Sequence, residues 1–398
     1  MQRRAMLRFA VATALAGSLG IGAASAQEAI RIGVVGPKTG FMAAGGAVTH
    51  WPNFKLWAEE VNNRGGLKLK SGQRKVELIE YDDRSQPAEA IKAIERLATQ
   101  DKVDFIMPVY GTGWNLAVAP VFAKYGYPQI AQAAVTDQMD TLTARYPTLF
   151  FVQGTTTAFA QSAANIMKKL KDEGKIGKRV AIVNVADAFG IELANAGRPI
   201  FNEAGFEIVF DRSYPNTAQD FAPIIKGAKA ANPDAFVAWS YPSDTFGLTE
   251  QAKIEGLNVK AYYNAVGVAF ATFRGKFGAS AEGVLGAGGI QDNAEIRGYY
   301  DRHKKVTGVD ADYWASPLYY TFLQIIEQAI EGVGEMDRAK ITEYLKNNTF
   351  KTIIGEADIR SQKLKRYWTV GQWQGGVFHA VNGVGFDNYQ PVNLKTGW

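Results

Sequence analysis

The sequence of 398 residues contains no cysteine. A thiol nucleophile, a disulfide, a zinc–thiolate centre and an iron–sulfur cluster are therefore all excluded, and so is a bacterial lipid anchor on an N-terminal cysteine. Histidine is nearly as scarce, because His50, His303 and His379 are its only occurrences. They are far apart in the chain and lie in no motif, which favours structural roles. We expect neither a metal site nor a cofactor.

Signatures of catalysis are also missing. The chain has no H-E-x-x-H, G-x-S-x-G or G-x-x-x-x-G-K-[ST] motif, and no G-x-G-x-x-G follows its first predicted strand. Asp82 and Asp83 are adjacent carboxylates at the end of a predicted strand, where such a pair more often orients a loop than catalyses a reaction. We expect no catalytic residues, and an exported enzyme is the least favoured class of function.

The first 26 residues have the three parts of a secretory signal peptide. Three arginines open the segment, an uncharged apolar stretch covers residues 9–21, and Ala24-Ser25-Ala26 provides the small residues of a cleavage site. We expect cleavage before Gln27 and a periplasmic protein without a lipid anchor. A buried N-terminal helix is the alternative, and Arg3-Arg4 leaves the choice between general and twin-arginine export open.

The net charge gives no reason to expect nucleic acid as a partner. Lys and Arg total 44 and Asp and Glu total 39, a formal charge of +5. Three of the arginines lie in residues 1–26, which hold no acid, so the rest of the chain carries about +2 and is close to balance. The excess of positive charge therefore belongs to the segment that is expected to be removed.

Residues 105–123 are uncharged and nearly long enough to span a membrane. The stretch contains Pro108, Gly111, Gly113 and Pro120, however. It therefore divides better into a buried strand, a glycine-rich turn and an amphipathic helix. We expect this segment to belong to a water-soluble domain.

Short apolar strands alternate with helices along the remaining chain. Strands are predicted over 30–35, 76–81, 105–109 and 128–131, and then over 150–152, 179–185, 207–210, 235–239 and 259–263. Helices are predicted over 48–63, 87–100, 114–124, 158–170, 191–204, 220–231 and 243–255, and later over 318–330 and 341–345. This alternation indicates parallel sheets covered by helices on both faces, and two sets in series indicate an α/β protein with two doubly wound lobes.

Ligands of such folds bind at the carboxyl ends of the strands, and two loops there are candidates. The residues Gly111-Thr112-Gly113-Trp114 lead into a helix, whose free N–H groups favour an anion such as a carboxylate. An ordinary turn capped by Thr112 is the alternative. The small residues Ala133-Ala134-Val135 follow the fourth strand, and their backbone N–H groups can face the same ligand.

Aromatic residues recur at the predicted strand ends. They are Phe41, Tyr110, Trp114, Phe189, Trp239 and Tyr241. A single aromatic residue at such a place usually belongs to the core, but the repetition favours a cleft lined by rings. That lining suits an apolar or aromatic small molecule held at one end by hydrogen bonds.

The chain resembles the leucine/isoleucine/valine-binding protein family, the periplasmic solute-binding components of branched-chain-amino-acid-type ABC importers. The resemblance extends from about Ile30 to about Trp373. It is carried by the segments IRIGVVGPKTG, AEEVNNRGGL, VELIEYDDRSQPAEAI, RVAIVNVADAFG and NPDAFVAWSYPSD.

The resemblance implies a type I periplasmic binding fold, in which three segments cross between the lobes and the ligand is trapped by hinge closure. We place the crossings near Phe150, Val284 and Ile353, so that residues 27–149 and 285–352 form the first lobe and residues 150–284 and 353–398 the second. The resemblance also implies that the two loops above hold the carboxylate of the ligand and that Phe189 and Tyr241 close from the second lobe.

One departure from the family bears on the ligand. Members that bind α-amino acids have an acidic residue after the strand near Tyr263, whereas this chain has Asn264-Ala265-Val266-Gly267-Val268. A buried ammonium group without a partner is costly, and Trp114 and Val135 also reduce the polarity of the pocket. We expect an aromatic or apolar carboxylate, with its ring against Trp114, Phe189 and Tyr241, and Val266 as a further ligand contact.

The expected function is capture of this small molecule and its delivery to an inner-membrane ABC permease by a monomeric binding protein. Binding of a branched-chain amino acid, or of an amide or urea, by the same fold is the first alternative. An exported ligand sensor is the second.

Overall fold

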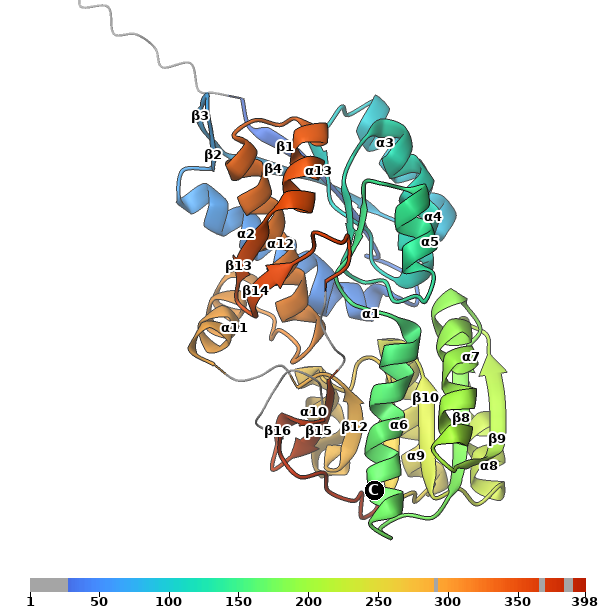
Figure 1. Cartoon of the computed structure of the whole chain (residues 1–398). Helices are drawn as coiled ribbons and strands as arrows, with labels where there is room; N and C mark the ends of the chain where they lie inside the picture. Colours follow the sequence, from blue (N-terminus) through green and yellow to red (C-terminus); the bar gives the residue numbers. More distant parts are fainter. Residues whose placement is uncertain (1–27, 290–292, 365–368, 383–388) are drawn as a thin grey trace, which may run out of the picture.

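The computed structural model describes residues 28–289, 293–364, 369–382 and 389–398, and shows two α/β lobes joined end to end (Figure 1). The predicted signal peptide, residues 1–26, lies outside the described residues. No helix in the described ranges is both long and apolar enough to cross a membrane. Residues 105–123 form a strand, a turn and a helix, as the sequence predicts.

The first lobe is built around short parallel strands in the order β4-β1-β5, with a separate parallel pair, β6-β7. Helices α2 and α12 cover one face of the strands, and α3 and α4 the other (Figure 1). The elements are β1 (Ile30–Gly36), α1 (Ala43–Gly45), the π-helical turn η1 (Gly46–His50), α2 (Trp51–Asn63), β2 (Leu67–Leu69), β3 (Gly72–Arg74), β4 (Val76–Asp82), α3 (Pro87–Thr99), β5 (Phe105–Ile106), α4 (Thr112–Tyr125), β6 (Gln129–Ala131), α5 (Met139–Arg145), β7 (Leu149–Phe151), α11 (Ala294–Thr307), α12 (Ala315–Val333), α13 (Arg338–Asn347), β13 (Thr349–Thr352) and β14 (Gly355–Asp358).

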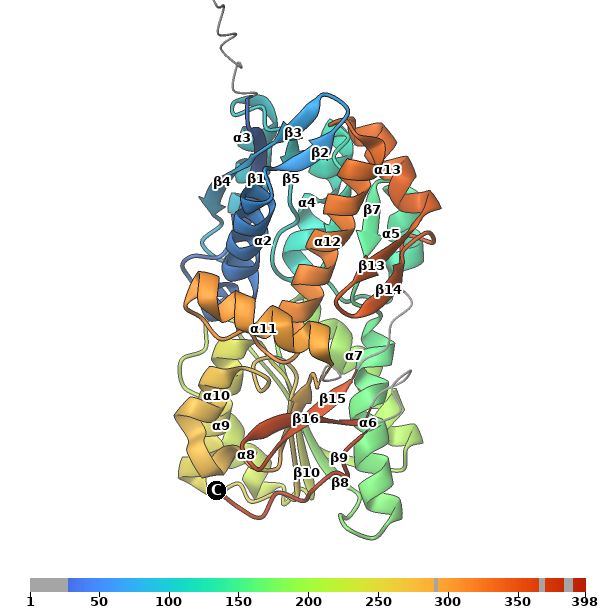
Figure 2. The same ribbon diagram turned by 90° about the vertical axis from the view of Figure 1, so that its left-hand side faces the viewer.

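The second lobe contains a seven-stranded sheet in the order β16-β15-β12-β11-β10-β8-β9. Its last five strands are parallel, while β15 pairs antiparallel with both β12 and β16. Helices α6 and α7 lie on one face and α8, α9 and α10 on the other (Figure 2). The elements are α6 (Thr156–Asp172), β8 (Arg179–Val185), α7 (Ala188–Glu203), β9 (Glu207–Tyr214), α8 (Ala222–Ala230), β10 (Ala235–Trp239), α9 (Pro242–Glu255), β11 (Ala261–Asn264), α10 (Ala271–Phe277), the 3₁₀ turn η2 (Gly278–Ala281), β12 (Val284–Ala287), β15 (Val370–Gln374) and β16 (Val377–Asn382).

The strands have the composition that parallel sheets require. Every residue of β10 and β12 is buried, and only the first residue of β8 is partly exposed. Helices cover both faces of these strands, so the sequence reads as continuous apolar runs rather than as alternation. The resulting core positions the strand ends at the boundary between the lobes.

Each of the three expected lobe boundaries falls inside an element of one lobe. The boundary at 149/150 falls inside β7, which pairs with β6 of the first lobe. The boundary at 284/285 falls inside β12, a strand of the second sheet. The boundary at 352/353 falls inside the β13–β14 hairpin, which packs on α12. The N–H of Leu364 donates to the carbonyl oxygen of Phe151, so the chain still lies beside β7 at that residue.

The secondary structure departs from prediction in several places. The helix expected from Val48 starts earlier, at α1, and passes through the π-helical turn before α2. Helices α5, α10 and α11 and the β15–β16 hairpin were not predicted individually. The hairpin makes the second sheet mixed rather than purely parallel, because β15 runs antiparallel to β12 and to β16 at one edge of the sheet.

Candidate ligand-binding site

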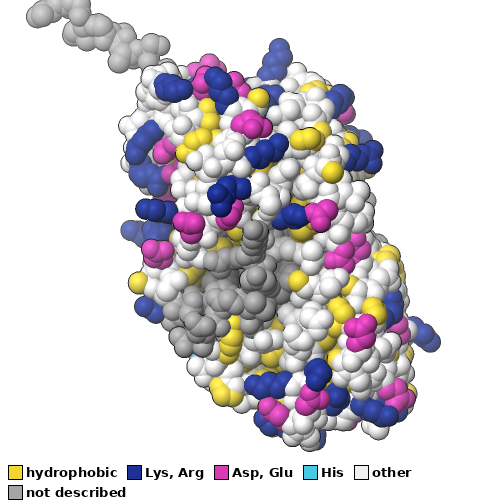
Figure 3. Space-filling view, in the orientation of Figure 1, with side chains coloured by type: hydrophobic (Ala, Val, Ile, Leu, Met, Phe, Trp, Pro, Cys, Tyr) yellow, Lys and Arg dark blue, Asp and Glu magenta, His cyan; other side chains and the backbone are white. Residues whose placement is uncertain are grey.

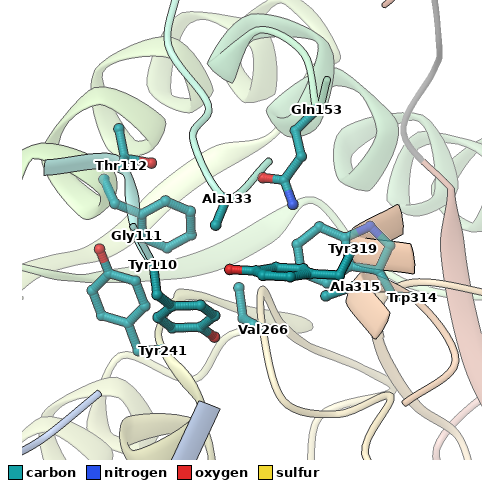
Figure 4. A pocket seen from close by; sticks show the side chains of 11 residues that line it. Tyr110, Gly111, Thr112, Ala133, Gln153, Tyr241, Val266, Trp314, Ala315 and Tyr319 are labelled. Atoms are coloured by element: carbon teal, nitrogen blue, oxygen red, sulfur yellow. The ribbon is translucent and has the colours of Figure 1, made fainter. Parts of the chain in front are cut away.

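A pocket lies between the two lobes, at the carboxyl ends of the strands. The space between its walls is about 380 Å³, part of it open to solvent. The first lobe and the crossing after β7 contribute Tyr110, Gly111, Thr112, Ala133, Gln153, Trp314, Ala315 and Tyr319, and the second contributes Phe189, Tyr241 and Val266 (Figure 4). None of these side chains carries a charge at neutral pH. The lining suits a small, largely apolar molecule.

One end of the pocket is the N-terminus of α4. Gly111 precedes the helix with a φ of +102°, a conformation that favours glycine, and no side chain caps the helix. Asn115 holds the turn, because its side-chain N–H group donates to the carbonyl oxygens of Val109 and Gly111 at 2.8 and 2.9 Å. The N–H groups of the first turn are therefore available to an anionic group.

Thr112 adds a donor at the same end. Its hydroxyl oxygen accepts a hydrogen bond from the backbone N–H of Val135 at 3.1 Å. The hydroxyl proton then remains to be donated to a ligand. The same bond occupies the Val135 N–H. This amide is therefore not available to a ligand, contrary to the expectation from the sequence.

The wall from the second lobe is a pair of stacked rings. Phe189 and Tyr241 lie 4.8 Å apart, centroid to centroid, with 23° between their planes. The Tyr241 hydroxyl donates to Asp187 at 2.8 Å, and Asp187 also accepts the Gly190 N–H as the N-cap of α7. Burial raises the pKa of Tyr241 well above its ordinary value, so the ring stays neutral. Phe189 therefore lines the pocket while stacked on Tyr241, whose position is fixed by its hydrogen bond to Asp187.

The opposite end of the pocket is formed by Gln153, Trp314, Ala315 and Tyr319 (Figure 4). Trp314 is the N-cap residue of α12, and the N-terminal amides of this helix already have acceptors. The buried carboxyl group of Asp312 accepts the N–H groups of Trp314, Ala315 and Ser316 at 2.8, 2.5 and 3.0 Å. Unlike α4, this helix end therefore has no free amide in its first turn for an anionic ligand.

A cluster of buried rings supports the floor of the pocket. His50 lies 6.2 Å from Tyr110 and 5.7 Å from Tyr319, centroid to centroid, and its Nδ1 is 3.4 Å from the Tyr319 hydroxyl. Burial lowers the pKa of His50 to about 3, so the imidazole is neutral at physiological pH. Burial also raises the pKa of Tyr110 and of Tyr319. The floor is therefore uncharged.

The acidic groups near the site are engaged within the protein. Asp244 accepts the Tyr241 N–H at 3.2 Å and the Tyr214 hydroxyl at 3.3 Å, and burial raises its pKa to about 6. Val266 lines the pocket in the stretch where an acid was expected for amino-acid binding. In the described part of the chain, no group of three or more His, Asp or Glu side chains could hold a metal ion.

Seven of the residues proposed from the sequence line the pocket: Tyr110, Gly111, Thr112, Ala133, Phe189, Tyr241 and Val266. Five do not: Phe41, Gly113, Trp114, Ala134 and Val135. The ring of Phe41 lies 5.9 Å from Trp114 and 6.0 Å from Tyr241, and lines a neighbouring groove. Trp114 is buried behind Phe41 and Gly111. The indole that lines the pocket is that of Trp314 instead.

Four lining residues were missed by the sequence reasoning: Gln153, Trp314, Ala315 and Tyr319. Gln153 directly follows the apolar run 150–152. A polar residue at the end of a predicted strand could have indicated a ligand contact. Tyr319 lies on an apolar helix and reads as a core residue. Nothing in the sequence places the start of α12 across the pocket from α4.

Contacts between the lobes enclose the pocket. Glu192 on α7 accepts hydrogen bonds from the hydroxyl of Thr136 at 2.9 Å and from the side-chain amide of Gln138 at 2.8 Å. On another side, the Ser243 hydroxyl of α9 donates to the carbonyl oxygen of Phe41 at 2.8 Å. The structure therefore has the lobes in contact around the pocket, as in a closed binding protein.

A sequence model described as periplasmic binding protein matches residues 29–377. The chain belongs to the periplasmic binding protein family. The resemblance found in the sequence and the type I fold class are thereby confirmed, and members of this family are solute-binding proteins of transporters rather than enzymes.

Known relatives of this periplasmic binding protein match along most of their length. An amino acid binding protein of Pseudomonas aeruginosa is 24% identical over 364 residues, which cover 90% of this chain and 93% of the relative. The isoleucine-bound substrate-binding protein LivJ of Streptococcus pneumoniae superposes with a TM-score of 0.76 at 20% identity, covering 89% and 99% of the two chains. A benzoate-bound solute-binding protein of R. palustris gives a TM-score of 0.76 at 16% identity, covering 92% and 99%.

Proposed function

We propose that this protein is the substrate-binding component of an ABC importer and that it captures a small aromatic or apolar carboxylate between its lobes. The observation that carries the proposal is the uncharged, ring-lined pocket with the uncapped end of α4 at one side. The carboxylate would accept hydrogen bonds from the first-turn N–H groups of α4 and from Thr112. The ring would lie between Phe189 and Trp314, where apolar and aromatic surface surrounds it.

The absence of charge from the lining argues against an α-amino acid. A bound amino acid would bury its ammonium group among Val266, Ala133 and aromatic rings. An unpaired ammonium in such surroundings costs several kcal/mol. The similar proteins crystallised with isoleucine and with benzoate have the same fold, so the fold alone does not choose between these ligands.

Capture would proceed by closure of one lobe on the other. A ligand that contacts both lobes binds the closed state more tightly and so increases its population. We further propose that the chain works as a monomer in the periplasm after cleavage before Gln27, and that an inner-membrane permease recognises the closed form. The described surface fits this role, since Lys, Arg, Asp and Glu side chains are interspersed over both lobes on the face shown in Figure 3.

Isothermal titration of the protein comprising residues 27–398 tests the ligand class. Benzoate and cinnamate are expected to bind, and leucine is not. Thr112→Val should weaken benzoate binding about tenfold because it removes the donor at the carboxylate end, whereas Thr112→Ser keeps the hydroxyl and should bind as the unchanged protein does.

Thermal unfolding provides an independent readout. At a ligand concentration a thousandfold above the dissociation constant, binding should stabilise the protein by about 4 kcal/mol. Tight binding of leucine together with no binding of either aromatic acid would overturn the proposed ligand class. A binding protein returns its ligand unchanged. Recovery of less benzoate after denaturation of the complex than was originally bound would therefore overturn the non-catalytic role.

A further inference from the structure

The pocket has two chemically different ends. At the α4 end, the first-turn N–H groups have no side-chain cap, and Thr112 has a hydroxyl proton to donate. At the α12 end, the carboxyl group of Asp312 accepts three backbone N–H groups and the hydroxyl of Ser316. The α4 end therefore offers hydrogen-bond donors to a carboxylate. At the α12 end, the N–H groups of the helix terminus are already bound by the carboxyl group of Asp312.

The α12 end nevertheless contains neutral polar groups. Figure 4 shows the carboxamide of Gln153 and the hydroxyl of Tyr319 directed into the pocket from the side opposite Gly111 and Thr112. Gln153 is 9% exposed and Tyr319 is fully buried, so neither polar group is open to bulk water. A carboxamide oxygen accepts hydrogen bonds and its NH₂ group donates them.

Tyr319 is positioned from behind by His50. The imidazole is neutral, and its Nδ1 lies 3.4 Å from the Tyr319 hydroxyl oxygen. When the hydroxyl donates its proton toward this nitrogen and accepts from the side chain of Gln132, one lone pair of its oxygen remains for a donor in the pocket. Tyr319 then offers an acceptor, and Gln153 offers an acceptor and a donor, at the same end.

We propose that Gln153 and Tyr319 form a subsite for a hydroxyl group on the ligand ring, opposite the carboxylate, so that the protein prefers hydroxylated aromatic acids. The subsite rests on the proposed function, because the carboxylate at α4 fixes which end of the ring reaches it. A ring that presents only a hydrogen atom or a methyl group here leaves buried polar groups without partners, which weakens binding. A ring with a hydroxyl group satisfies them.

Titration calorimetry with benzoate, 4-hydroxybenzoate and 4-methylbenzoate tests the subsite, since a methyl group is close to a hydroxyl group in size but makes no hydrogen bond. The unchanged protein should bind 4-hydroxybenzoate about tenfold more tightly than 4-methylbenzoate. Gln153→Met and Tyr319→Phe should each reduce this ratio severalfold and leave the affinity for 4-methylbenzoate within about twofold.

Tyr263→Phe is the matched control, because it removes a buried hydroxyl without a hydrogen-bond partner from the core of the second lobe. It should leave the ratio unchanged. The ratio of the affinities for 4-hydroxybenzoate and 4-methylbenzoate is informative even if a variant is less stable, because both acids bind the same folded protein. If Tyr319→Phe folds poorly, Gln153→Met still tests the subsite. Equal binding of all three acids to the unchanged protein, or an unaltered ratio in both variants, would overturn the subsite alone. Binding of none of the three acids would overturn the proposed ligand class together with the subsite.

Discussion

At the scale of single residues, His50 is the clearest case of a group whose chemistry is set by burial. It is fully buried between Trp51, Phe54 and Tyr319, and the ring lies against Gly36, where a Cβ atom would be 2.4 Å from Nε2. Burial lowers its pKa from 6.5 to about 3. The ring is therefore a neutral support for the floor of the pocket.

The pH dependence of stability follows from this pKa. Because the folded-state pKa lies below the unfolded one, the unfolded chain binds the proton first as the pH falls. The contribution of His50 is complete above about pH 6.5 and is lost as the pH falls toward 3. Between about pH 7.5 and pH 4.5 this group alone should cost about 2–3 kcal/mol of unfolding free energy.

Urea denaturation at the two pH values, applied to the unchanged protein and to His50→Gln, measures this effect. Glutamine does not titrate, so the variant should lose correspondingly less stability on acidification, although it starts from a lower value at neutral pH. Equal pH dependence in the two proteins would mean that His50 does not stay neutral in the folded state.

At the scale of elements, the N-termini of α12 and α13 differ in how their N–H groups are satisfied. The N-terminus of α12 depends on Asp312, which is fully buried. The N-terminus of α13 depends on Asp337, whose side chain lies at the surface and accepts the backbone N–H groups of Lys340 and Ala339. We therefore expect Asp312 to contribute more to the free energy of unfolding than Asp337 does.

Asp312→Ala is expected to lower the free energy of unfolding by about 2–4 kcal/mol, because it leaves several buried donors without an acceptor. Asp337→Ala should cost about 1 kcal/mol, the ordinary value for the loss of one cap. Urea denaturation of both variants makes the comparison. A cost for Asp312→Ala no larger than that for Asp337→Ala would show that the N-terminus of α12 finds other acceptors.

At the scale of the whole molecule, closure depends on contacts that exist only when the lobes meet. The carboxylate of Glu192 on the second lobe accepts from Thr136 and Gln138 of the first lobe. Both bonds end on the same oxygen, Oε1. In the proposed closure these bonds would form only in the closed state, and they would therefore shift the equilibrium on which the ligand acts.

Glu192→Ala should weaken benzoate binding about 5- to 30-fold, because two hydrogen bonds of the closed state are lost. Small-angle X-ray scattering should also show a larger radius of gyration for the variant at ligand concentrations that close the unchanged protein. Glu192→Gln retains an acceptor oxygen and is the control, with affinity expected within about threefold of the original. Unaltered affinity and radius in Glu192→Ala would assign no role in closure to this contact.

The residue pattern predicted the α/β class and many element positions, since apolar runs and glycine stops are local signals. Gly111, Gly126 and Gly256 mark helix ends because each has a positive φ that other residues adopt at a cost. The three expected lobe boundaries fall inside β7, β12 and the β13–β14 hairpin. Which strand a segment pairs with depends on partners far along the chain, as the β13–β14 hairpin shows.

The sequence by itself determined the strand–turn–helix that carries Tyr110, Gly111 and Thr112, and the lack of an acid beside Val266. Only the tertiary structure decided that Trp314 rather than Trp114 lines the pocket, and that Gln153 and Tyr319 stand opposite α4. Phe41 and Trp114 pack against each other, so the ring that the sequence placed in the cleft is covered by a neighbour. The physical reason is that a local pattern fixes backbone conformation, whereas exposure to the cleft depends on how distant elements pack.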